Sequence, residues 1–408
     1  MDGTTVAGLV FDMFSPARRA NPYPCYHAAR EVGALVPSPL GAYLVTGYHD
    51  CTTVLQDPAW GHGYSDGISP FRPGVAADDI PGSFIRMDPP DHTRLRGLVG
   101  RAFTPREIGR LRPRIEQIAA ELFDTVVDAG EIEIVDALAS RIPLTIICDL
   151  LGVPAADYAR FDGWARALAR GLDPDVLLSP EELRQRDDAA DAFNEYFRDV
   201  VAQRLTRPGD DLISRLAALE QDGDRLTGTE LLDICVLLLF GGYETTVHMT
   251  GNCVLALGRH PEQLALLRTQ PDLVPAAVDE LLRFDPPVQF TNRVALQERQ
   301  LAGRTFARGE GVVVLIAGAN RDPRIFPVPD RLDLTRFAGG GLGPRHLAFG
   351  LGVHFCLGAQ LARMELEIIL AMLVRRVTAI DILDSSPSYH DTLTIRGLRN
   401  LRVRLRSG

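Results

Sequence analysis

The chain has 408 residues, of which 46% are hydrophobic and 24% are charged, and its formal net charge is −10. This balance is typical of a folded globular protein and excludes a disordered or collagen-like chain. The acidic pI of about 5.4 argues against nucleic acid as a partner. All 43 basic residues are arginine and none is lysine, which we attribute to GC-rich coding.

The N-terminal stretch MDGTTVAGLVFDMFSPARRANPYP has no basic end followed by a long apolar core. It therefore predicts neither a signal peptide nor a membrane anchor. The longest apolar runs, such as residues 234–240, are too short to cross a bilayer. Together these features predict a cytoplasmic protein.

The cysteines are scattered along the chain with no C-x-x-C spacing. This pattern argues against a zinc site and against the disulfide framework of a secreted protein. At most one cysteine is therefore expected to have a special role.

Helical periodicity dominates from about residue 113 onward. Further helices are predicted near residues 139–152, 181–205, 228–259, 272–284 and 357–376. Strand-like alternation is confined to short segments at 42–46, 311–316, 380–383 and 401–406. The pattern predicts a mainly α-helical fold with small β-sheets, and because no repeat or linker divides the chain, a single domain over residues 1–408.

Two other segments stand out by composition. Residues 60–90 and 318–345 are rich in proline and glycine, which predicts long loops that cover a site. Between residues 94 and 114 there are seven arginines, at 94, 96, 101, 106, 110, 112 and 114, against one acid, Glu107. This stretch is either a docking face for an acidic partner or an ordinary solvated helix face.

The sequence FGLGVHFCLG, residues 349–358, places Cys356 just before a predicted amphipathic helix. The helix N-terminus favours a thiolate there, as a nucleophile or as a metal ligand. A nucleophile needs a base, and His354 is two residues away, a spacing that usually directs the side chains apart. A glycine-lined thiolate loop fits better as the axial ligand of a haem, which lies flat against backbone.

This stretch closely resembles the haem-ligand signature of the cytochrome P450 superfamily. The resemblance implies that Cys356 binds the iron of haem b, that Phe349 packs near the sulfur, and that Gly350 and Gly358 let the loop lie flat. It also implies that His354 hydrogen-bonds a haem propionate, although an ordinary loop histidine is the alternative. The implied structure is the cytochrome P450 fold, with haem between a long central helix and the helix after the cysteine loop.

The stretch LLLFGGYETTVHMT, residues 237–250, has two adjacent glycines within a helical pattern. Each glycine lowers the stability of a helix by about 1 kcal/mol relative to alanine, so the presence of two needs a structural or functional reason. Close helix packing is one reason. The stretch also resembles the family's oxygen-activation motif, which implies that Gly241 and Gly242 leave room over the haem. Glu244 and Thr245 would then lie beside a local helix opening and pass protons during dioxygen activation.

Glu280 and Arg283 form an E-x-x-R pair on one face of a predicted helix. Such a pair alone is a weak signal, because most surface ion pairs contribute little. The pair lies between the oxygen-activation motif and the cysteine loop, as it does in the family. Arg336, in DLTRF, resembles the arginine with which the family's pair interacts. The resemblance assigns Glu280, Arg283 and Arg336 a role in the fold and the haem pocket, not in catalysis.

Haem propionates require cationic or hydrogen-bonding partners in a partly dry pocket. His92 and Arg96, in MDPPDHTRLR, lie at i and i+4 and resemble the pair found in bacterial members of the family. Arg293, in FTNRVA, resembles a further propionate arginine. The alternative for each is a surface residue.

The resemblance covers nearly the whole chain and implies a soluble bacterial monooxygenase that uses O2. Electrons would come from a ferredoxin and its reductase, with NAD(P)H acting only through them, and Arg101 and Arg106 would face the acidic ferredoxin. A peroxide-driven relative would be expected to lack the Glu244–Thr245 pair. A non-catalytic partner protein could lose Cys356, and a haem gas sensor would carry an output domain for which the chain has no room.

The family builds its substrate pocket from several segments of the chain. The corresponding residues are mainly apolar and predict a lipophilic substrate: Trp60, Phe71, Leu238, Val288, Phe290 and Leu393. A polyketide, macrolide, terpenoid or aromatic compound would fit, as would a carrier-protein-bound amino acid or acyl chain. Hydroxylation, epoxidation and oxidative coupling all stay open. By association, the lysine-free composition is typical of actinobacterial enzymes of secondary metabolism and antibiotic biosynthesis.

Overall fold

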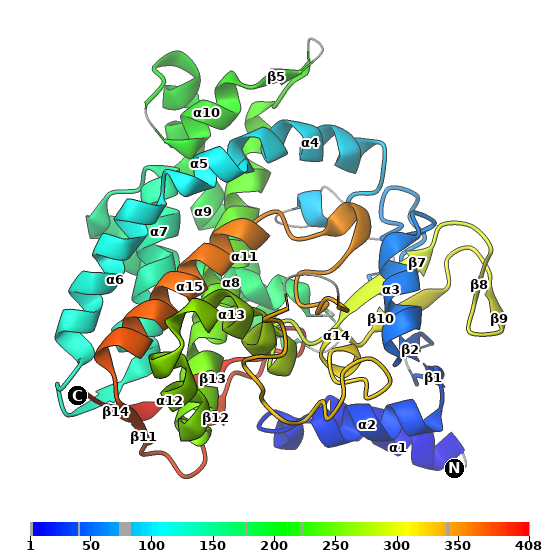
Figure 1. The fold of residues 1–408 in the computed structure, drawn as a ribbon. Helices are drawn as coiled ribbons and strands as arrows, with labels where there is room; N and C mark the ends of the chain where they lie inside the picture. The colour runs from blue at the N-terminus through cyan, green and yellow to red at the C-terminus, as the bar shows by residue number, and fades with distance from the viewer. Residues whose placement is uncertain are drawn as a thin grey trace.

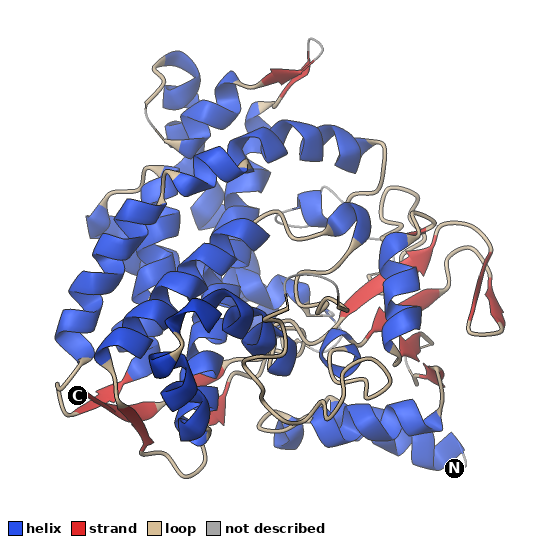
Figure 2. Cartoon of the chain, in the orientation of Figure 1, coloured by secondary structure: helices blue, strands red, loops and turns tan. Residues whose placement is uncertain are grey.

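The computed structural model describes residues 3–39, 41–72, 83–173, 175, 178–209, 211–221, 224–339 and 343–407. Helices make up most of this structure, and the strands gather at one side and at one lower corner of the view in Figure 2, with one short pair at the top. The helices of the first half are α1 (Gly3–Met13), α2 (Tyr23–Val32), α3 (Tyr48–Gln56), α4 (Asp91–Gly100), α5 (Pro105–Gly109), α6 (Arg112–Val126), α7 (Arg141–Leu151), α8 (Tyr158–Ala169) and α9 (Pro180–Thr206). The helices of the second half are α10 (Leu212–Ala218), α11 (Gly228–Arg259), α12 (Pro261–Thr269), α13 (Val274–Phe284), α14 (Ile316–Ala319) and α15 (Ala359–Arg376).

The main sheet has five strands in the order β1-β2-β10-β7-β3. These are β1 (Leu35–Pro37), β2 (Tyr43–Val45), β3 (Trp60–Gly61), β7 (Thr291–Ala295) and β10 (Gly311–Val314). β10 runs parallel to β2 and antiparallel to β7, with Val312 opposite Arg293. The sheet thereby fixes the position of Arg293.

The remaining strands form smaller sheets. β4 (Glu131–Glu133), β11 (Ala379–Ile382) and β14 (Arg402–Arg406) form a three-stranded sheet in the order β11-β14-β4. Three pairs complete the set: β5 (Glu220–Gln221) with β6 (Asp224–Arg225), β8 (Arg299–Leu301) with β9 (Arg304–Phe306), and β12 (Ser388–Tyr389) with β13 (Leu398–Asn400).

The two longest helices begin with capping boxes. At α11 the Thr227 hydroxyl accepts from the Glu230 backbone N–H, and the Glu230 carboxylate accepts from the Thr227 N–H. Ser179 and Glu182 do the same at the start of α9. Each box satisfies N–H groups that have no partner within the helix, which fixes where the helix begins.

Helix α11 passes through the core and contacts α7, α8, α9 and α15 (Figure 1). Its length and a mean hydropathy of 1.3 over its most apolar window would allow it to cross a membrane by those criteria alone. The sequence expectation considered uninterrupted apolar runs only and so did not register α11. Within the fold, 67% of that window is buried, as in the core helix of a globular protein.

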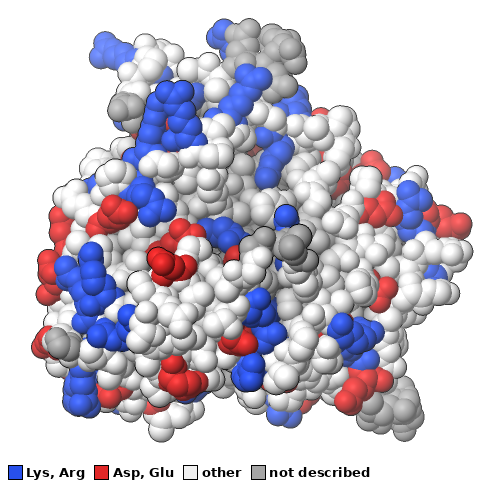
Figure 3. All heavy atoms as spheres, viewed as in Figure 1, with Lys and Arg blue, Asp and Glu red and all other residues white. Residues whose placement is uncertain are grey.

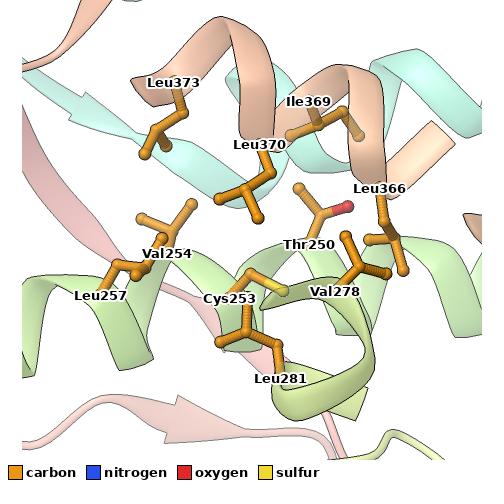
Figure 4. A pocket seen from close by; sticks show the side chains of 10 residues that line it. All are labelled: Thr250, Cys253, Val254, Leu257, Val278, Leu281, Leu366, Ile369, Leu370 and Leu373. Carbon is orange, nitrogen blue, oxygen red and sulfur yellow. The ribbon is translucent and has the colours of Figure 1, made fainter. Parts of the chain in front are cut away.

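Helices α11, α13 and α15 pack around a small apolar cavity of about 10 Å³ (Figure 4). Cys253 and Thr250 of α11 face Leu370 of α15 and Val278 of α13 across it. A space of this size holds at most about one water molecule. Cys253 therefore belongs to the packing of the core.

Glu365 of α15 is buried in this helical core, with 3% of the residue exposed. Its Oε2 atom has no hydrogen-bond partner among the described residues. Burial raises the pKa of the Glu365 carboxyl to about 8. The carboxyl is therefore mostly protonated at neutral pH and must ionise inside the protein at higher pH.

Replacing Glu365 should show how far the burial of this carboxyl lowers the free energy of unfolding as the pH rises. The folded-state pKa of Glu365 lies above its unfolded value near 4.5, so the unfolded state releases the proton first and stability falls between pH 4.5 and about 8. We expect Glu365→Gln to unfold at higher urea concentration than the wild type at pH 8, and at a similar concentration at pH 5. Between these two pKa values the contribution of Glu365 to the free energy of unfolding falls by about 1.4 kcal/mol per pH unit. A difference that does not change with pH would contradict burial of an ionisable carboxyl.

Candidate active site

The cysteine loop turns tightly before α15 and presents Cys356 at the start of that helix. The Cys356 backbone N–H donates to the Phe349 carbonyl at 2.9 Å, and the Gly350 N–H donates to Leu347 at 2.8 Å. Burial raises the pKa of the Cys356 thiol, while backbone N–H groups of Gly358 and Ala359 and the charge of Arg96 act in the opposite direction. The sulfur thus accepts N–H bonds at a helix N-terminus, an environment suited to a thiolate once a cation offsets burial.

The glycines of this loop serve different purposes. Gly350 and Gly352 have φ values of 65° and 69°, a region that residues with a side chain rarely adopt. A Cβ on Gly352 would also lie 2.2 Å from the Leu55 carbonyl oxygen of α3. Gly358 has φ of −84°, and a Cβ there would meet nothing within 4 Å. Gly358 therefore borders open space beside the sulfur, whereas Gly352 lets the loop pack on α3.

Substitutions at these two glycines should have different effects. We expect Gly352→Ala to lower the free energy of unfolding by roughly 1–3 kcal/mol or more, because backbone strain and the clash with Leu55 add. Gly358→Ala should leave the unfolding free energy of cofactor-free protein near the wild-type value, but lower the amount of cofactor retained. Urea unfolding and pigment content per protein measure the two effects. Equal unfolding midpoints for both variants would contradict this assignment.

Four polar residues from four different segments of the chain meet at the cysteine loop, three of them buried and His354 half-buried. We call His62, His92, Arg293 and His354 the donor cluster. The His354 ring centroid lies 4.2 Å from that of His92 and 4.8 Å from that of His62. His92, on α4, is 2% exposed and stacks on Phe84, while Arg293, on β7, is 5% exposed.

Several polar atoms of the donor cluster have no partner. His62 Nδ1, His92 Nδ1 and His354 Nε2 are buried with no hydrogen-bond partner among the described residues. Within the described part of the chain, Arg293 donates only to its neighbours Thr291 Oγ1 and the Asn292 carbonyl. Buried polar groups are normally paired, so the donor cluster is built for an acceptor that the protein itself does not supply.

The electrostatics of the donor cluster agree with this interpretation. Burial, followed by the charges of Arg96 and Arg293, lowers the pKa of His92 to about 4. Burial, with Arg293, His92 and Arg96, lowers the pKa of His354 to about 2, and burial lowers that of Arg293 to about 10. Arg96 and Arg293 thus disfavour positive charge on His92 and His354. An anion carrying carboxylates would relieve this repulsion and satisfy the unpartnered donors.

His62 was not identified from the sequence. The Asp88 carboxylate accepts from the backbone N–H groups of His62 at 2.8 Å and Gly63 at 2.7 Å, which anchors this loop to the start of α4. Arg96, half-buried on α4, makes no hydrogen bond or ion pair with another described residue. A histidine between two glycines in a loop, GHG at 61–63, was the available signal for His62.

Helix α11 has an open face in the middle of its buried length. Gly241 and Thr245 are partly exposed and Gly242 is exposed, while the residues around them are buried. A Cβ on Gly241 would meet only Leu237 of its own helix, at 3.6 Å. A Cβ on Gly242 would contact Ile147 of α7 at the same distance, so helix packing also involves Gly242. The open face provides room for a ligand against α11.

The expected opening of the helix at this position is absent. Helix α11 is continuous from Gly228 to Arg259. The Thr245 hydroxyl donates to the Gly241 carbonyl at 2.7 Å, and the Thr246 hydroxyl donates to the Gly242 carbonyl at 3.0 Å. Such bonds offer the carbonyls a second donor and loosen a helix without breaking it. The predicted local opening is therefore not present in the backbone of α11.

Glu244 lies next to Thr245 but is engaged elsewhere. Its side chain is 7% exposed, and its Oε2 atom is 3.1 Å from His248 Nε2, one turn further along α11. Glu244 and His248 both line a polar cavity on the side of α8 and α9. The carboxylate is thus positioned between the open face of α11 and this cavity.

The E-x-x-R pair is fully buried, unlike an ordinary surface pair. The Glu280 and Arg283 side chains are 0% exposed and form a two-point ion pair at 2.6 and 2.8 Å. Arg336 Nε donates to Glu280 Oε2 at 3.0 Å, which brings together the three residues that the sequence grouped. Arg283 also donates to the carbonyls of Asn320 and Pro329, so the group ties α13 to the loop before the cysteine.

The residues predicted as substrate-pocket walls divide into two groups. Leu238 lies on α11 four residues before Gly242, and Val288 forms a bridge with Ile395 in the C-terminal segment. Phe290 packs edge-on against Phe14 at 5.3 Å, in an apolar cluster with Leu393. These two residues therefore form part of the core beneath α1, and their role as pocket walls stays a prediction.

Two other residues expected in the pocket pack with the main sheet. Trp60, in β3, packs edge-on against Phe306 at 5.2 Å in the sheet core, and the Phe71 ring lies against Gly311 of β10. Their role as pocket walls stays a prediction. Residues 73–82 of the predicted loop at 60–90 lie outside the described residues.

The loop before α4 contacts the segment after α8, while its role as a cover of the site stays a prediction. Arg72 donates to the Gly171 carbonyl at 2.7 Å, and Arg86 donates to the same oxygen at 2.6 Å. These buried arginines attach the loop before α4 to the segment after α8. The two segments are therefore held together in this structure.

Comparisons with known proteins agree with this site. A family model described as Cytochrome P450 matches residues 174–387. The chain is 38% identical to the vitamin D(3) 25-hydroxylase of Pseudonocardia autotrophica, over 98% of each protein. It is also 38% identical to the 6-deoxyerythronolide B hydroxylase of Saccharopolyspora erythraea, over 98% of this chain and 99% of that protein.

Two solved structures show the same fold. Mycobacterium smegmatis CYP164A2 with econazole bound has a TM-score of 0.88 and 36% identity, over 98% of this chain and 100% of that one. P450BioI in complex with an acyl carrier protein that bears hexadec-9Z-enoic acid has a TM-score of 0.86 and 33% identity, over 96% and 99%. The chain belongs to the cytochrome P450 family. It is a cytochrome P450 monooxygenase and is similar to bacterial enzymes of this family.

Membership of this family implies a haem with a thiolate ligand, and the residues present fit it. The donor cluster matches the two carboxylates of the porphyrin, and the open face of α11 and the space beside Gly358 match its flat ring. Cys356 would hold the iron, with Arg96 and the donor cluster holding the propionates. When bound, the group supplies activation of dioxygen, which electron donation from the thiolate favours.

Proposed function

We propose that this monooxygenase hydroxylates or epoxidises a lipophilic small molecule of the polyketide, macrolide, terpenoid or aromatic type in secondary metabolism. The main observation in favour of a haem-thiolate centre is the donor cluster beside Cys356, which has buried polar atoms without partners among the described residues. Thr245, on the open face of α11, and Glu244, next to it on the side of the polar cavity, would pass protons during dioxygen activation. The hydroxylase names of the two relatives support the class of reaction and a large substrate.

An absorbance titration of the purified ferric protein tests this proposal. A panel of macrolides, other polyketides, terpenoids and aromatic compounds would be added at increasing concentration. We expect a saturable Soret shift with at least one class, because a substrate that displaces water from the iron changes its spin state. A protein that binds no haem even when haem is supplied would overturn the proposal and favour the non-catalytic partner protein.

A carrier-bound substrate is the second candidate, and one observation favours it. A similar structure, P450BioI, is solved in complex with an acyl carrier protein that bears a fatty acid. In that case free compounds would leave the Soret band unchanged, while an acyl group on a carrier protein would shift it. The same titration therefore distinguishes the two candidates.

We further propose that a single catalytic domain spans residues 1–408 and that electrons come from a ferredoxin and its reductase. The main hydrophobic core draws on residues from Phe84 to Leu405, which supports one domain. For the ferredoxin, the predicted arginine-rich stretch offers a face around α4 and α5, where arginine side chains cluster at the top of Figure 3. Several of these arginines already pair with acids, among them Arg94 with Glu230 and Arg114 with Asp149.

Charge reversal tests this docking face. Arg106 is exposed and forms no ion pair with another described residue, so its charge is available to an acidic partner. We expect Arg101→Glu with Arg106→Glu to slow ferredoxin-supported turnover several-fold at low salt, and less at high salt because screening weakens the attraction. Arg198→Glu on α9 is the control. Turnover unchanged by the double reversal would exclude this face.

A further inference from the structure

The segment that leads into the cysteine loop, residues 345–350, lies in none of the described helices or strands. Two of its backbone N–H groups donate to side chains instead. The Leu347 N–H donates to Asn320 Oδ1 at 2.6 Å, and the Ala348 N–H donates to His346 Nδ1 at 3.2 Å. These side chains therefore determine the path of the chain just before the sulfur.

His346 is itself held from two helices. Its side chain is 4% exposed, and its Nε2 atom lies 3.2 Å from Asp279 Oδ1 on α13. Arg363, on α15, forms an ion pair with the same Asp279 oxygen, and its Nη2 atom lies 3.4 Å from His346 Nε2. Helices α13 and α15 pack side by side (Figure 1). We call Asp279, His346 and Arg363 the loop clamp.

The loop clamp determines which nitrogen of His346 carries the proton. Because Nδ1 accepts from a backbone N–H, the proton of a neutral ring is on Nε2, which donates to Asp279. Burial, opposed by the hydrogen bond to Asp279, lowers the pKa of His346, so the ring is neutral near pH 7. Burial acts to raise the pKa of Asp279, but the hydrogen bonds to His346 and Arg363 outweigh it and lower that pKa, so the carboxylate stays charged. The two bonds together fix the orientation of the ring.

Two members of the loop clamp also lie against Phe349. The His346 ring centroid is 5.6 Å from that of Phe349, and the Arg363 guanidinium carbon is 5.5 Å from the same centroid. The Phe349 carbonyl accepts from the Cys356 N–H at 2.9 Å. His346 is therefore connected to the cysteine by one backbone bond and one ring contact.

We propose that His346 is a positioning residue for the thiolate ligand, which it holds in place through the Ala348 N–H and the Phe349 ring. The inference rests on the proposed haem-thiolate function and adds to it a residue outside the cysteine loop. In the position that the loop takes, the sulfur of Cys356 accepts from backbone N–H groups at the start of α15. Such bonds withdraw electron density from a ligand sulfur and so favour the reduced state of its iron. Asp279 and Arg363 hold His346 in the orientation that this role requires.

Two amide variants separate the roles of the two ring nitrogens. In His346→Asn the side-chain oxygen can take the place of Nδ1 and accept from Ala348, but the side chain is too short to reach Asp279. In His346→Gln the longer side chain can take the place of Nε2 and donate to Asp279, but the Ala348 N–H loses its acceptor. Both variants remove the ring, so they share the loss of packing and differ in the bond to the loop.

Amide hydrogen exchange of the haem-free protein tests the bond to the loop. We expect the Ala348 N–H to exchange about fivefold faster or more in His346→Gln than in the wild type, because a buried N–H group then has no acceptor. In His346→Asn the exchange rate should stay close to that of the wild type. Equal exchange rates in the two variants would show that Nδ1 does not hold Ala348, and the proposal would be wrong.

A reductive titration of the holoenzyme without substrate tests the effect on the ligand. We expect His346→Gln to lower the ratio of reduced to oxidised iron at a fixed potential several-fold, because the loop shifts and the sulfur loses part of its N–H bonding. His346→Asn should keep a ratio close to that of the wild type. The reduced carbon monoxide complex should keep the Soret position of thiolate ligation in both variants, which excludes loss of the ligand as the cause.

His27 provides a control with the same residue types. Its Nε2 atom lies 3.1 Å from Asp330 Oδ1, and its Nδ1 atom lies 3.1 Å from Arg30 Nη1 on α2. His27→Gln should change neither the exchange of the Ala348 N–H nor the ratio of reduced to oxidised iron. A ratio that falls equally in both variants of His346 would show that the ring only fills the core, and would overturn the positioning role.

The outcomes separate this inference from the proposed function. A wild-type ratio in His346→Gln would overturn the role of His346 while leaving the haem-thiolate centre intact. A wild-type protein that takes up no haem would overturn the proposed function instead. Should only His346→Gln fail to take up haem, the exchange of its Ala348 N–H in the haem-free protein still decides between the two roles of the ring.

Discussion

Replacement of Cys356 by serine should abolish monooxygenase turnover while leaving the fold intact. The donor cluster and the open face of α11 would still be present, so some haem should bind. A serine hydroxyl, however, does not replace a thiolate as an electron donor to iron. We expect the reduced carbon monoxide complex to lose the Soret position typical of thiolate ligation, and product formation to fall to the background of haem-free protein.

Cys253→Ala is the matched control for this experiment. Cys253 lies in the packed core between α11, α13 and α15 (Figure 4). Its removal should leave the spectrum and the turnover unchanged. A thiolate-type spectrum that persists in Cys356→Ser, or disappears in Cys253→Ala, would show that the axial ligand has been assigned to the wrong cysteine.

The largest effect on stability is expected from Glu280→Gln. This change removes the negative charge between Arg283 and Arg336 at a site that is fully buried for Glu280 and Arg283. Breaking a buried ion pair typically costs about 3–5 kcal/mol, because the remaining charge stays buried and uncompensated. Whole domains are stable by only about 5–15 kcal/mol. We therefore expect a strongly lowered urea midpoint and a low yield of haem-containing protein.

The chain offers a control with the same residue types and spacing. Glu181 and Arg184 form an i,i+3 ion pair on α9, with side chains 55% and 66% exposed. Glu181→Gln should change the free energy of unfolding by less than about 1 kcal/mol, because exposed pairs are screened by water. Similar midpoints for Glu181→Gln and Glu280→Gln would contradict a structural role for the buried group.

Much of the helical framework was predictable from sequence. The periodic segments near 181–205, 228–259 and 357–376 correspond to α9, α11 and α15 within about two residues, because capping boxes or the glycine loop mark their starts. The strands at 42–46 and 311–316 correspond to β2 and β10. The strand β7, which carries Arg293, was missed because its residues TNRVA mix polar and apolar side chains without clear alternation.

Site residues that lie within one short motif were predictable from the sequence. Site residues that the fold brings together from distant segments were not. Cys356 and its glycines lie within one short stretch, so their relation could be read directly. His62 joins the donor cluster from a distant loop, and His390 reaches His248 from the C-terminal segment. No sequence spacing encodes such meetings. Similarly, Trp60 is an apolar aromatic residue of the kind that lines pockets, but the pairing of β3 with β7 places it in the sheet core.

The donor cluster has a consequence for how the protein matures in a cell. The donor cluster is confined beside the cysteine loop, and the ligand that satisfies its unpartnered atoms has to come from outside the chain. A ligand that binds the folded state only adds its binding free energy to the stability of that state. Chain synthesised faster than haem is supplied would therefore populate an open, protease-sensitive form around α4 and the cysteine loop. Haem supply, more than translation rate, should set the yield of mature enzyme.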